Sequence, residues 1–386
     1  MAMRAWTWRA VGARRLARHA LLAPAPAARL VEVAGAVCGI HAQVMPAAEV
    51  SLGMRVAGVT RQDIRAALWE TRRLVKTYGL RGTLHLFPAA ELPLWMAALR
   101  AGPGPDPRRL AARGLDRAQL AQLVAAIGDA LDGQRLTLAQ LGAAVVQRAG
   151  AWAGEEIIPA WSGQWPRWRL ALGDAALAGR LCFGPNVGSA VTFVRPDQWA
   201  GPWQDLDPDT ALAEVLRRYL HAYGPATARD FAQWLNIPPA LARSVMATLT
   251  ADLVEVDVEG HRAFLLAADA AEGEIAEAES VRLLPHFDCY LIGCHPRAQL
   301  VPAAWAARVL PHGQAGPVPV LLVDGTVAGV WTRQAQGRRV DLRVESFTPL
   351  RARQQDLLAA EATRVGAILE APITLTVGPV TVRPHL

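Results

Sequence analysis

An imidazole and a carboxamide lie two positions apart early in the chain, in the segment Gly39-Ile40-His41-Ala42-Gln43, and Pro46 follows closely. Because the chain must turn before this proline, we expect the segment to be extended or turning, so that side chains at i and i+2 point the same way. His41 and Gln43 could then hold one water molecule between them. On spacing alone the commoner alternative is structural, with His41 capping the preceding helix and Gln43 satisfying loop backbone groups.

Basic and hydroxyl side chains gather around two predicted hairpins, where they are suited to contacts with phosphates. Arginine predominates among them, and its planar fork donates two hydrogen bonds to one phosphate. A solvated hairpin with ordinary polar residues is the alternative at the first of these sites. The candidate DNA-binding residues are Arg72, Arg73, Lys76, Arg81, Thr83 and His85 around the first hairpin and Arg167, Arg169 and Arg180 around the second.

A third polar segment runs from His286 to His295 and contains Cys289 and Cys294. The spacing of its two cysteines is not one of the standard structural zinc patterns, and its alternation favours a barrel strand with inward cysteines. We therefore predict no metal, although a zinc-dependent enzyme built on this segment stays an alternative. No phosphate-binding loop, dinucleotide fingerprint or nucleophile elbow is found in the sequence, so we predict no cofactor.

Composition says little about function but excludes several classes of protein. The chain has 386 residues, 52% of them hydrophobic, which is too apolar for a disordered protein. Its 40 basic and 34 acidic residues give a net charge of +6, which is compatible with nucleic acid without requiring it. Arginines near the N-terminus interrupt any secretory leader, and four cysteines are too few for a disulfide scaffold. No apolar run is long enough to span a membrane. We predict a soluble cytoplasmic protein, associated with the nucleoid when bound to DNA.

Helices followed by a hairpin occur three times, an order typical of winged-helix domains. Thr60, Asp116, Thr137 and Thr210 are the predicted N-caps of four of the helices. The predicted helices cover residues 26–40, 61–69, 117–131, 138–149, 168–178, 210–221, a segment opening near 226, and 240–251. The predicted hairpins cover residues 74–87, 181–194 and 253–266.

The last part of the chain is strand-rich, with one helix over residues 350–369 and a final strand over 373–377. This pattern predicts a small β-barrel or β-sandwich covered by one helix. The expected class is therefore α+β, with three tandem winged-helix units and a C-terminal barrel-like domain. The expected domains are residues 1–100 with the His-x-Gln motif, 101–205, 206–270 and 271–386.

Seven short motifs, in order, resemble the AlkZ-like winged-helix DNA glycosylases. They are GIHAQ (39–43), LRGTLHL (80–86), LCFG (181–184), VTFV (191–194), YGPAT (223–227), LPHFD (284–288) and LVDGTVAG (322–329). The resemblance implies a concave DNA channel built by three winged helices, and excision of alkylated purines, bulky adducts included, from double-stranded DNA. The family's catalytic pair is commonly Gln-x-Gln, or Gln-x-Asp in a related branch, and His41 and Gln43 occupy those positions here.

The implied chemistry suits this pair. A purine alkylated at N7 or N3 carries positive charge and leaves without prior protonation, so a positioned water and about 3–6 kcal/mol of help suffice. Gln43 would orient the water and neutral His41 would accept its proton. Lys76 is the only lysine, so covalent Schiff-base chemistry has no other side-chain candidate and we predict a monofunctional enzyme. We also predict that the enzyme is a monomer. A non-enzymatic winged-helix regulator is the alternative, although regulators usually dimerise, whereas three unequal units in one chain favour a single channel.

Overall fold

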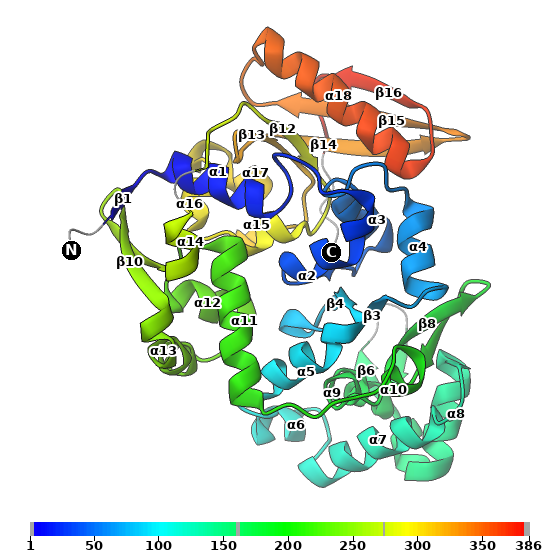
Figure 1. Ribbon diagram of the computed structural model, residues 1–386. Coiled ribbons are helices and arrows are strands. Elements are labelled where there is room, and N and C mark those ends of the chain that lie inside the picture. The colour runs from blue at the N-terminus through cyan, green and yellow to red at the C-terminus, as the bar shows by residue number, and fades with distance from the viewer. Residues whose placement is uncertain (1–3, 160–162, 273–274, 382–386) are drawn as a thin grey trace. The chain divides into compact units, whose positions relative to one another are not determined.

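The computed structural model describes residues 4–159, 163–272 and 275–381 (Figure 1). Contacts within the chain divide it into two compact units: unit 1 is Met1–Ala66 with Leu216–Leu386, and unit 2 is Ala67–Val215. Both units mix helices with strands, which confirms the α+β class. None of the helices in the described part of the chain is both long and apolar enough to cross a membrane.

Unit 1 begins with an extended strand and three helices that bracket the His-x-Gln motif. Thr7 caps the first helix by accepting a hydrogen bond from the Ala10 amide. The prediction of one helix over residues 26–40 is wrong at its end, because Cys38 and Gly39 have φ angles of 64° and 92°, and the chain leaves the helix there. The elements are β1 (Arg4–Trp6), α1 (Trp8–Arg18), α2 (Leu30–Ala36), β2 (Ile40–His41) and α3 (Met45–Gly53).

The third predicted set of helices and hairpin is present as expected. Its first helix is capped by Asp207, whose carboxylate accepts from the Thr210 amide at 2.9 Å, so the prediction of Thr210 as the cap is wrong by one turn. Strand β1 pairs in parallel with β10, an addition that the sequence did not predict. The elements are α11 (Pro208–Tyr223), α12 (Ala228–Leu235), α13 (Pro239–Thr248), β10 (Leu253–Val258) and β11 (His261–Leu266).

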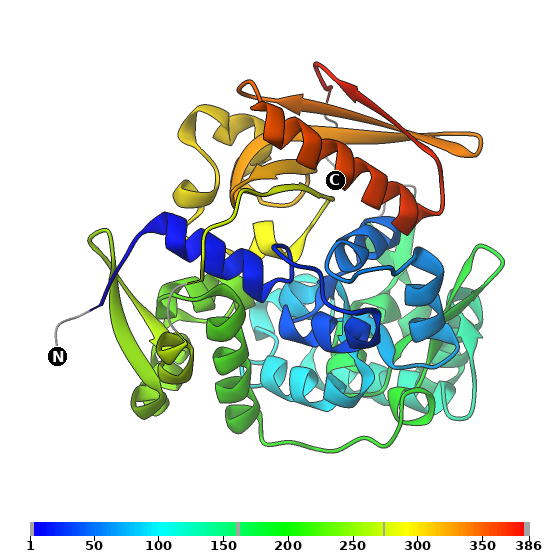
Figure 2. The ribbon, with the colours of Figure 1, turned by 45° about the horizontal axis from the view of Figure 1, so that its top comes forward.

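Five strands and a long helix follow, and the expected barrel is not closed. The described strands form one sheet in the order β12-β13-β14-β15-β16, with β12 and β16 at its edges. Helix α18 (Ala352–Leu369) lies along this sheet (Figure 2) and buries Leu358, Ala362 and Val365 against it. Because the helix covers the apolar face, closure is not needed to bury it. The strands are β12 (Val281–Leu284), β13 (Val320–Val323), β14 (Thr326–Gln336), β15 (Arg339–Ser346) and β16 (Ile373–Val377).

Short helices, not a barrel strand, occupy the Cys289 segment. Asp288 accepts a hydrogen bond from the Tyr290 amide at 2.9 Å and so caps α15 (Cys289–Gly293). The alternation of residues 286–295 therefore belongs to a loop and one helical turn, and the strand prediction is wrong. The other short helices of unit 1 are α14 (Ala267–Ala271), α16 (Arg297–Leu300) and α17 (Ala306–Val309).

Unit 2 contains the first two predicted hairpins and the helices around them. Helix α4 (Arg61–Trp69) leads into it from unit 1, and reciprocal capping boxes at Asp116 and Thr137 start α7 and α8 as predicted. The hairpin β6–β7 was not predicted. The elements are β3 (Leu74–Tyr78), β4 (Leu84–Pro88), α5 (Leu92–Arg100), α6 (Pro107–Ala112), α7 (Arg117–Ala130), β5 (Leu136–Thr137), α8 (Leu138–Ala149), β6 (Glu156–Pro159), β7 (Gln164–Pro166), α9 (Leu172–Leu177), β8 (Cys182–Val187), β9 (Ala190–Val194) and α10 (Pro196–Trp199).

Candidate active site

The His-x-Gln motif lies in unit 1 between the end of α2 and the start of α3. His41 is the second residue of β2 and its side chain is buried, whereas Gln43 is exposed in the turn before α3. The end of α2 is closed by the backbone itself, since the Gly39 amide donates to the Ala34 carbonyl at 2.9 Å. The backbone thus supplies at least one of the hydrogen bonds that close this helix.

One face of the His41 imidazole is covered by an aromatic ring. The phenyl ring of Phe287 stacks on it, with ring centroids 4.8 Å apart and planes 27° apart. Phe287 is only half-buried, and its backbone lies in the left-handed region with φ 58°. The His286 ring follows at 6.3 Å from Phe287. Both residues belong to the LPHFD segment, which the sequence linked to the family but not to the motif.

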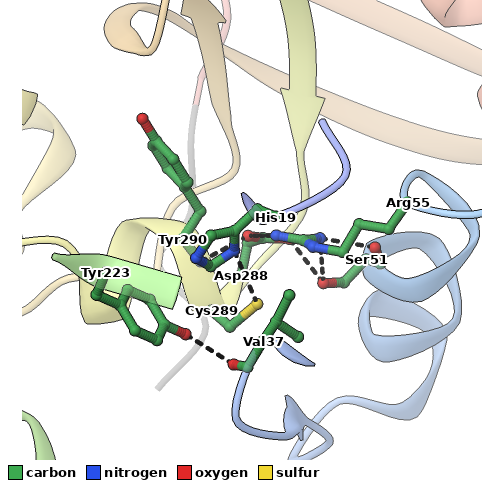
Figure 3. Close-up of polar contacts among 8 residues, drawn as sticks. All are labelled: His19, Val37, Ser51, Arg55, Tyr223, Asp288, Cys289 and Tyr290. Carbon is green, nitrogen blue, oxygen red and sulfur yellow. Dashed lines mark hydrogen bonds and ion pairs between the residues drawn. The ribbon is translucent and has the colours of Figure 1, made fainter. Parts of the chain in front are cut away.

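A buried ion pair lies directly after Phe287 in the chain (Figure 3). The guanidinium of Arg55 donates to both carboxylate oxygens of Asp288, at 2.7 and 2.9 Å, and neither side chain is exposed. The Ser51 hydroxyl donates to the same carboxylate at 2.6 Å. Ser51 belongs to α3, and Arg55 follows two residues after that helix ends. The pair thus joins the helix that follows the motif to the loop that carries Phe287.

Electrostatics fix the charge states in this network. Burial alone would raise the pKa of Asp288, but the Arg55 guanidinium and hydrogen bonds from Arg55 and Ser51 hold that pKa below its ordinary value. Burial lowers the pKa of His19 well below its usual range, and the Arg55 charge lowers it further. His19, which lies next to Cys289 with Nδ1 4.0 Å from Sγ, is therefore neutral at physiological pH, and the network carries one compensated pair of charges.

The cysteines of this region are poor candidates for metal binding. Cys289 and Cys294 are buried, and burial raises the pKa of their thiols to about 12 and about 11. Thiolate is the form that binds zinc. Within the described ranges no group of three or more histidine, cysteine or acidic residues could hold a metal ion. Nothing in the described chain therefore favours the zinc-dependent alternative.

The nine candidate DNA-binding residues all lie in unit 2. Arg72, Arg73 and Arg180 are exposed and His85 is buried, its ring stacked on Phe87 at 5.7 Å. Arg81 is half-buried at the tip of the β3–β4 hairpin, with φ 58°. The others, Lys76, Thr83, Arg167 and Arg169, are half-buried.

Several of these cations lie over aromatic rings of unit 2. The Arg72 guanidinium is 3.9 Å from the Trp199 ring centre, and the Arg169 guanidinium is 3.8 Å from that of Trp165. Arg167 also bonds to Glu155 and to the Gly114 carbonyl, and Lys76 lies over Phe183. Arginine stacked on tryptophan keeps its charge while its side chain is held in place. Through its bonds to Glu155 and Gly114, Arg167 also links two segments of unit 2, in addition to being a candidate phosphate contact.

Sequence reasoning missed Phe287, Asp288, Ser51 and Arg55 as neighbours of the motif. One signal was present: Ser51 and Arg55 are polar, four positions apart, in the otherwise apolar run VSLGMRV (50–56). Buried polar groups require partners, so such a pair on one helical face indicates a distant buried acid. Which acid it contacts is a long-range question that spacing does not answer.

Comparison with known proteins identifies the family of the chain. A family model described as DNA glycosylase AlkZ-like matches residues 34–368. The chain is 32% identical over 382 residues to the interstrand DNA cross-link repair glycosylase of Streptomyces sahachiroi, with 96% of this chain and 99% of the relative covered. The solved structure of Streptomyces sahachiroi DNA glycosylase AlkZ is similar with a TM-score of 0.81 and 29% identity, over 96% of this chain and 99% of that one. These matches confirm the resemblance found in the sequence, and the chain belongs to the AlkZ-like DNA glycosylase family.

Proposed function

We propose that this DNA glycosylase is monofunctional and removes purines alkylated at N7 or N3, bulky adducts included, by water-mediated hydrolysis of the N-glycosidic bond. The observation that carries the proposal is that His41 and Gln43 lie in one short segment, with Gln43 exposed, at the positions that the resemblance assigns to the catalytic pair. An exposed carboxamide is able to bind and orient a water molecule, and an imidazole is able to accept a proton.

The reaction needs little beyond this pair. The bond between the sugar C1′ and the purine nitrogen breaks, its electron pair stays on the base and cancels the positive charge there, and the sugar develops oxocarbenium character. The Gln43 carbonyl accepts a hydrogen bond from the water, whose oxygen adds to C1′, and neutral His41 accepts the proton. Positioning and electrostatic help worth about 3–6 kcal/mol are enough for such a leaving group. A neutral purine is a poor substrate, because neither position carries a carboxyl group that would protonate it.

The relative's name adds one substrate class to this proposal. The Streptomyces sahachiroi protein is called an interstrand DNA cross-link repair glycosylase. A cross-link that joins two alkylated purines presents the same cationic leaving group at each end. We include it among the substrates, since excision at either end would free one strand from the other.

Double-stranded DNA is bound, in this proposal, by three winged-helix units with the boundaries 1–100, 101–205 and 206–270, followed by the C-terminal domain over 271–386. Each of the three helix-and-hairpin sets offers a hairpin as its wing. The basic residues among the nine candidates of unit 2 are the proposed phosphate contacts, which fix the position of the duplex without reading its sequence. Because one chain carries all three sets, we propose that it acts as a monomer.

A panel of oligonucleotide duplexes tests the function directly. The duplexes carry 7-methylguanine, 3-methyladenine, a bulky N7-guanine adduct, an interstrand cross-link or no lesion, and the products are the free base and an abasic site. We expect release from the cationic lesions and none from undamaged DNA. Binding without release from any duplex would favour the regulator and contradict the glycosylase.

The single lysine allows a clean test of the proposed monofunctional chemistry. Borohydride added during excision traps a covalent adduct only when an amine has formed a Schiff base with the sugar. We expect no trapped adduct with the wild-type protein, and excision by Lys76→Ala within about 3-fold of wild type. An adduct present in wild type and lost in Lys76→Ala would overturn the prediction.

The hairpin tip offers a test of the DNA contacts. Arg81→Ala removes one proposed phosphate contact, so the plot of log affinity against log salt should lose about one unit of slope. His85→Ala is also expected to weaken binding, through loss of the packing on Phe87 that supports this hairpin. Arg117→Ala, an exposed change at the start of α7, is the control. Binding unaffected by either hairpin variant would place the duplex elsewhere.

A further inference from the structure

Phe287 is held in a conformation that an isolated chain would avoid. Its φ of 58° is rare for a bulky aromatic residue and makes the backbone strained. Such strain persists only where the surroundings determine it. The ring that results from this backbone geometry stacks on His41 at 4.8 Å. The question is which contacts impose the conformation.

The first set of contacts comes from the backbone of residues 316 and 317. The Phe287 amide donates to the Gly316 carbonyl at 2.7 Å, and His286 Nδ1 lies 2.8 Å from the Pro317 carbonyl. Gly316 has φ 104°, and a Cβ added there would lie 3.0 Å from the Phe287 ring and 3.1 Å from its Cα. The positive φ and the close approach both favour glycine at this position. The loop of residues 316–317 is therefore in direct contact with Phe287.

The second set is the buried network around Asp288 (Figure 3). The carboxylate next to Phe287 is bound by Arg55 and Ser51 and accepts from the Tyr290 amide. Since α3 starts at Met45, two residues after Gln43, the network connects back to the motif through one short helix. Contacts within unit 1 therefore run from the motif through α3 and the ion pair to Phe287, and the Phe287 ring contacts His41 in the motif again.

We propose that Phe287 is a positioning residue for His41, and that the Arg55–Asp288–Ser51 network and the 316–317 loop hold it in place for that purpose. The inference rests on the proposed function of His41. An imidazole with one face covered loses the rotations that would turn it away from the water, and the free energy of ordering it is met when the protein folds. The half-buried phenyl ring suits this task, because one of its faces covers His41 while part of the ring remains exposed to solvent.

The test is a double-mutant cycle in single-turnover excision. Phe287→Leu keeps an apolar side chain but loses the stacked ring, and we expect excision of 7-methylguanine to slow by about 10-fold with DNA affinity changed less than about 2-fold. In a His41→Ala background the same change should cost less than about 2-fold, since Phe287 acts through His41. Phe287→Tyr keeps the ring and should restore the rate to within about 3-fold of wild type.

A matched control and an independent readout complete the design. Phe347 is also half-buried and stacks on another ring, that of Trp305 at 4.4 Å, so Phe347→Leu should leave excision within about 2-fold of wild type. In NMR spectra the His41 ring protons are expected to move downfield in Phe287→Leu, because the phenyl ring current is lost. This shift reports the stacking even if wild type excises nothing, a result that would refute the proposed function alone.

Three outcomes would overturn the positioning role. Excision unchanged in Phe287→Leu would show that the ring does not matter to the reaction. An equal loss in the presence and absence of His41 would show that Phe287 acts by another route. Unchanged His41 resonances would show that the stack is absent in solution.

Discussion

Replacing His41 or Gln43 with alanine is expected to slow single-turnover excision of a 7-alkylguanine by at least about 10-fold, with DNA affinity nearly unchanged. Gln43→Ala removes the group that orients the water, and His41→Ala removes the group that accepts its proton. Neither side chain is among the proposed phosphate contacts, so binding should survive. Rates come from rapid mixing with excess enzyme and affinities from fluorescence anisotropy.

His41→Gln is the matched variant for this prediction. It installs the carboxamide pair that the family commonly carries, so we expect it to retain more activity than His41→Ala. A carboxamide orients a water molecule but is a much weaker proton acceptor than imidazole. Activity in both alanine variants equal to that of wild type would remove the catalytic assignment, and a matching loss of affinity would move these residues to substrate binding.

Asp288→Asn is expected to destabilise the folded protein by about 3–5 kcal/mol, because it leaves the guanidinium of Arg55 buried without a countercharge. Both side chains are wholly buried, so water cannot replace the lost partner. Chemical denaturation followed by tryptophan fluorescence measures the change. Glu255→Gln, which breaks a pair with the exposed side chain of Arg262 on the β10–β11 hairpin, should leave the midpoint within error.

Acid supplies a second check on the same ion pair. The folded protein holds the pKa of Asp288 below its ordinary value, which is near 4 in the unfolded chain. The stability that this carboxylate contributes is therefore complete at neutral pH and is lost as the pH falls below about 4 toward the folded pKa. The difference in stability between wild type and Asp288→Asn should narrow over that range. A constant difference would show that the substitution acts through packing.

Features set by neighbouring residues were predictable from the sequence. Helices α4, α7 and α8 start at their predicted caps, and the β10–β11 hairpin has its predicted limits, because capping boxes and strict alternation are local signals. The His-x-Gln pair was found because both members lie in one short segment. In each case the residues that determine the structure lie within a few positions of one another.

Features set by distant residues were not predictable. Residues 286–295 alternate like a strand, yet Asp288 caps a helical turn there because its carboxylate is also bound by Arg55. Alternation in the sequence also indicates the strands β13 to β15, but it does not show whether their sheet closes into a barrel. The sheet is open, and helix α18 buries its apolar face. Phe287 reaches His41 only through contacts made across most of the chain.

The interrupted course of unit 1 along the chain has a consequence for biosynthesis. His41 leaves the ribosome early, but its supporting acid and phenyl ring lie in the segment that begins at Leu216, after the whole of unit 2 has been made. A nascent or truncated polypeptide that stops before residue 287 carries the proposed catalytic pair without the groups proposed to orient it. Under the proposed roles of these residues, excision activity is therefore expected only from chains that extend beyond Asp288.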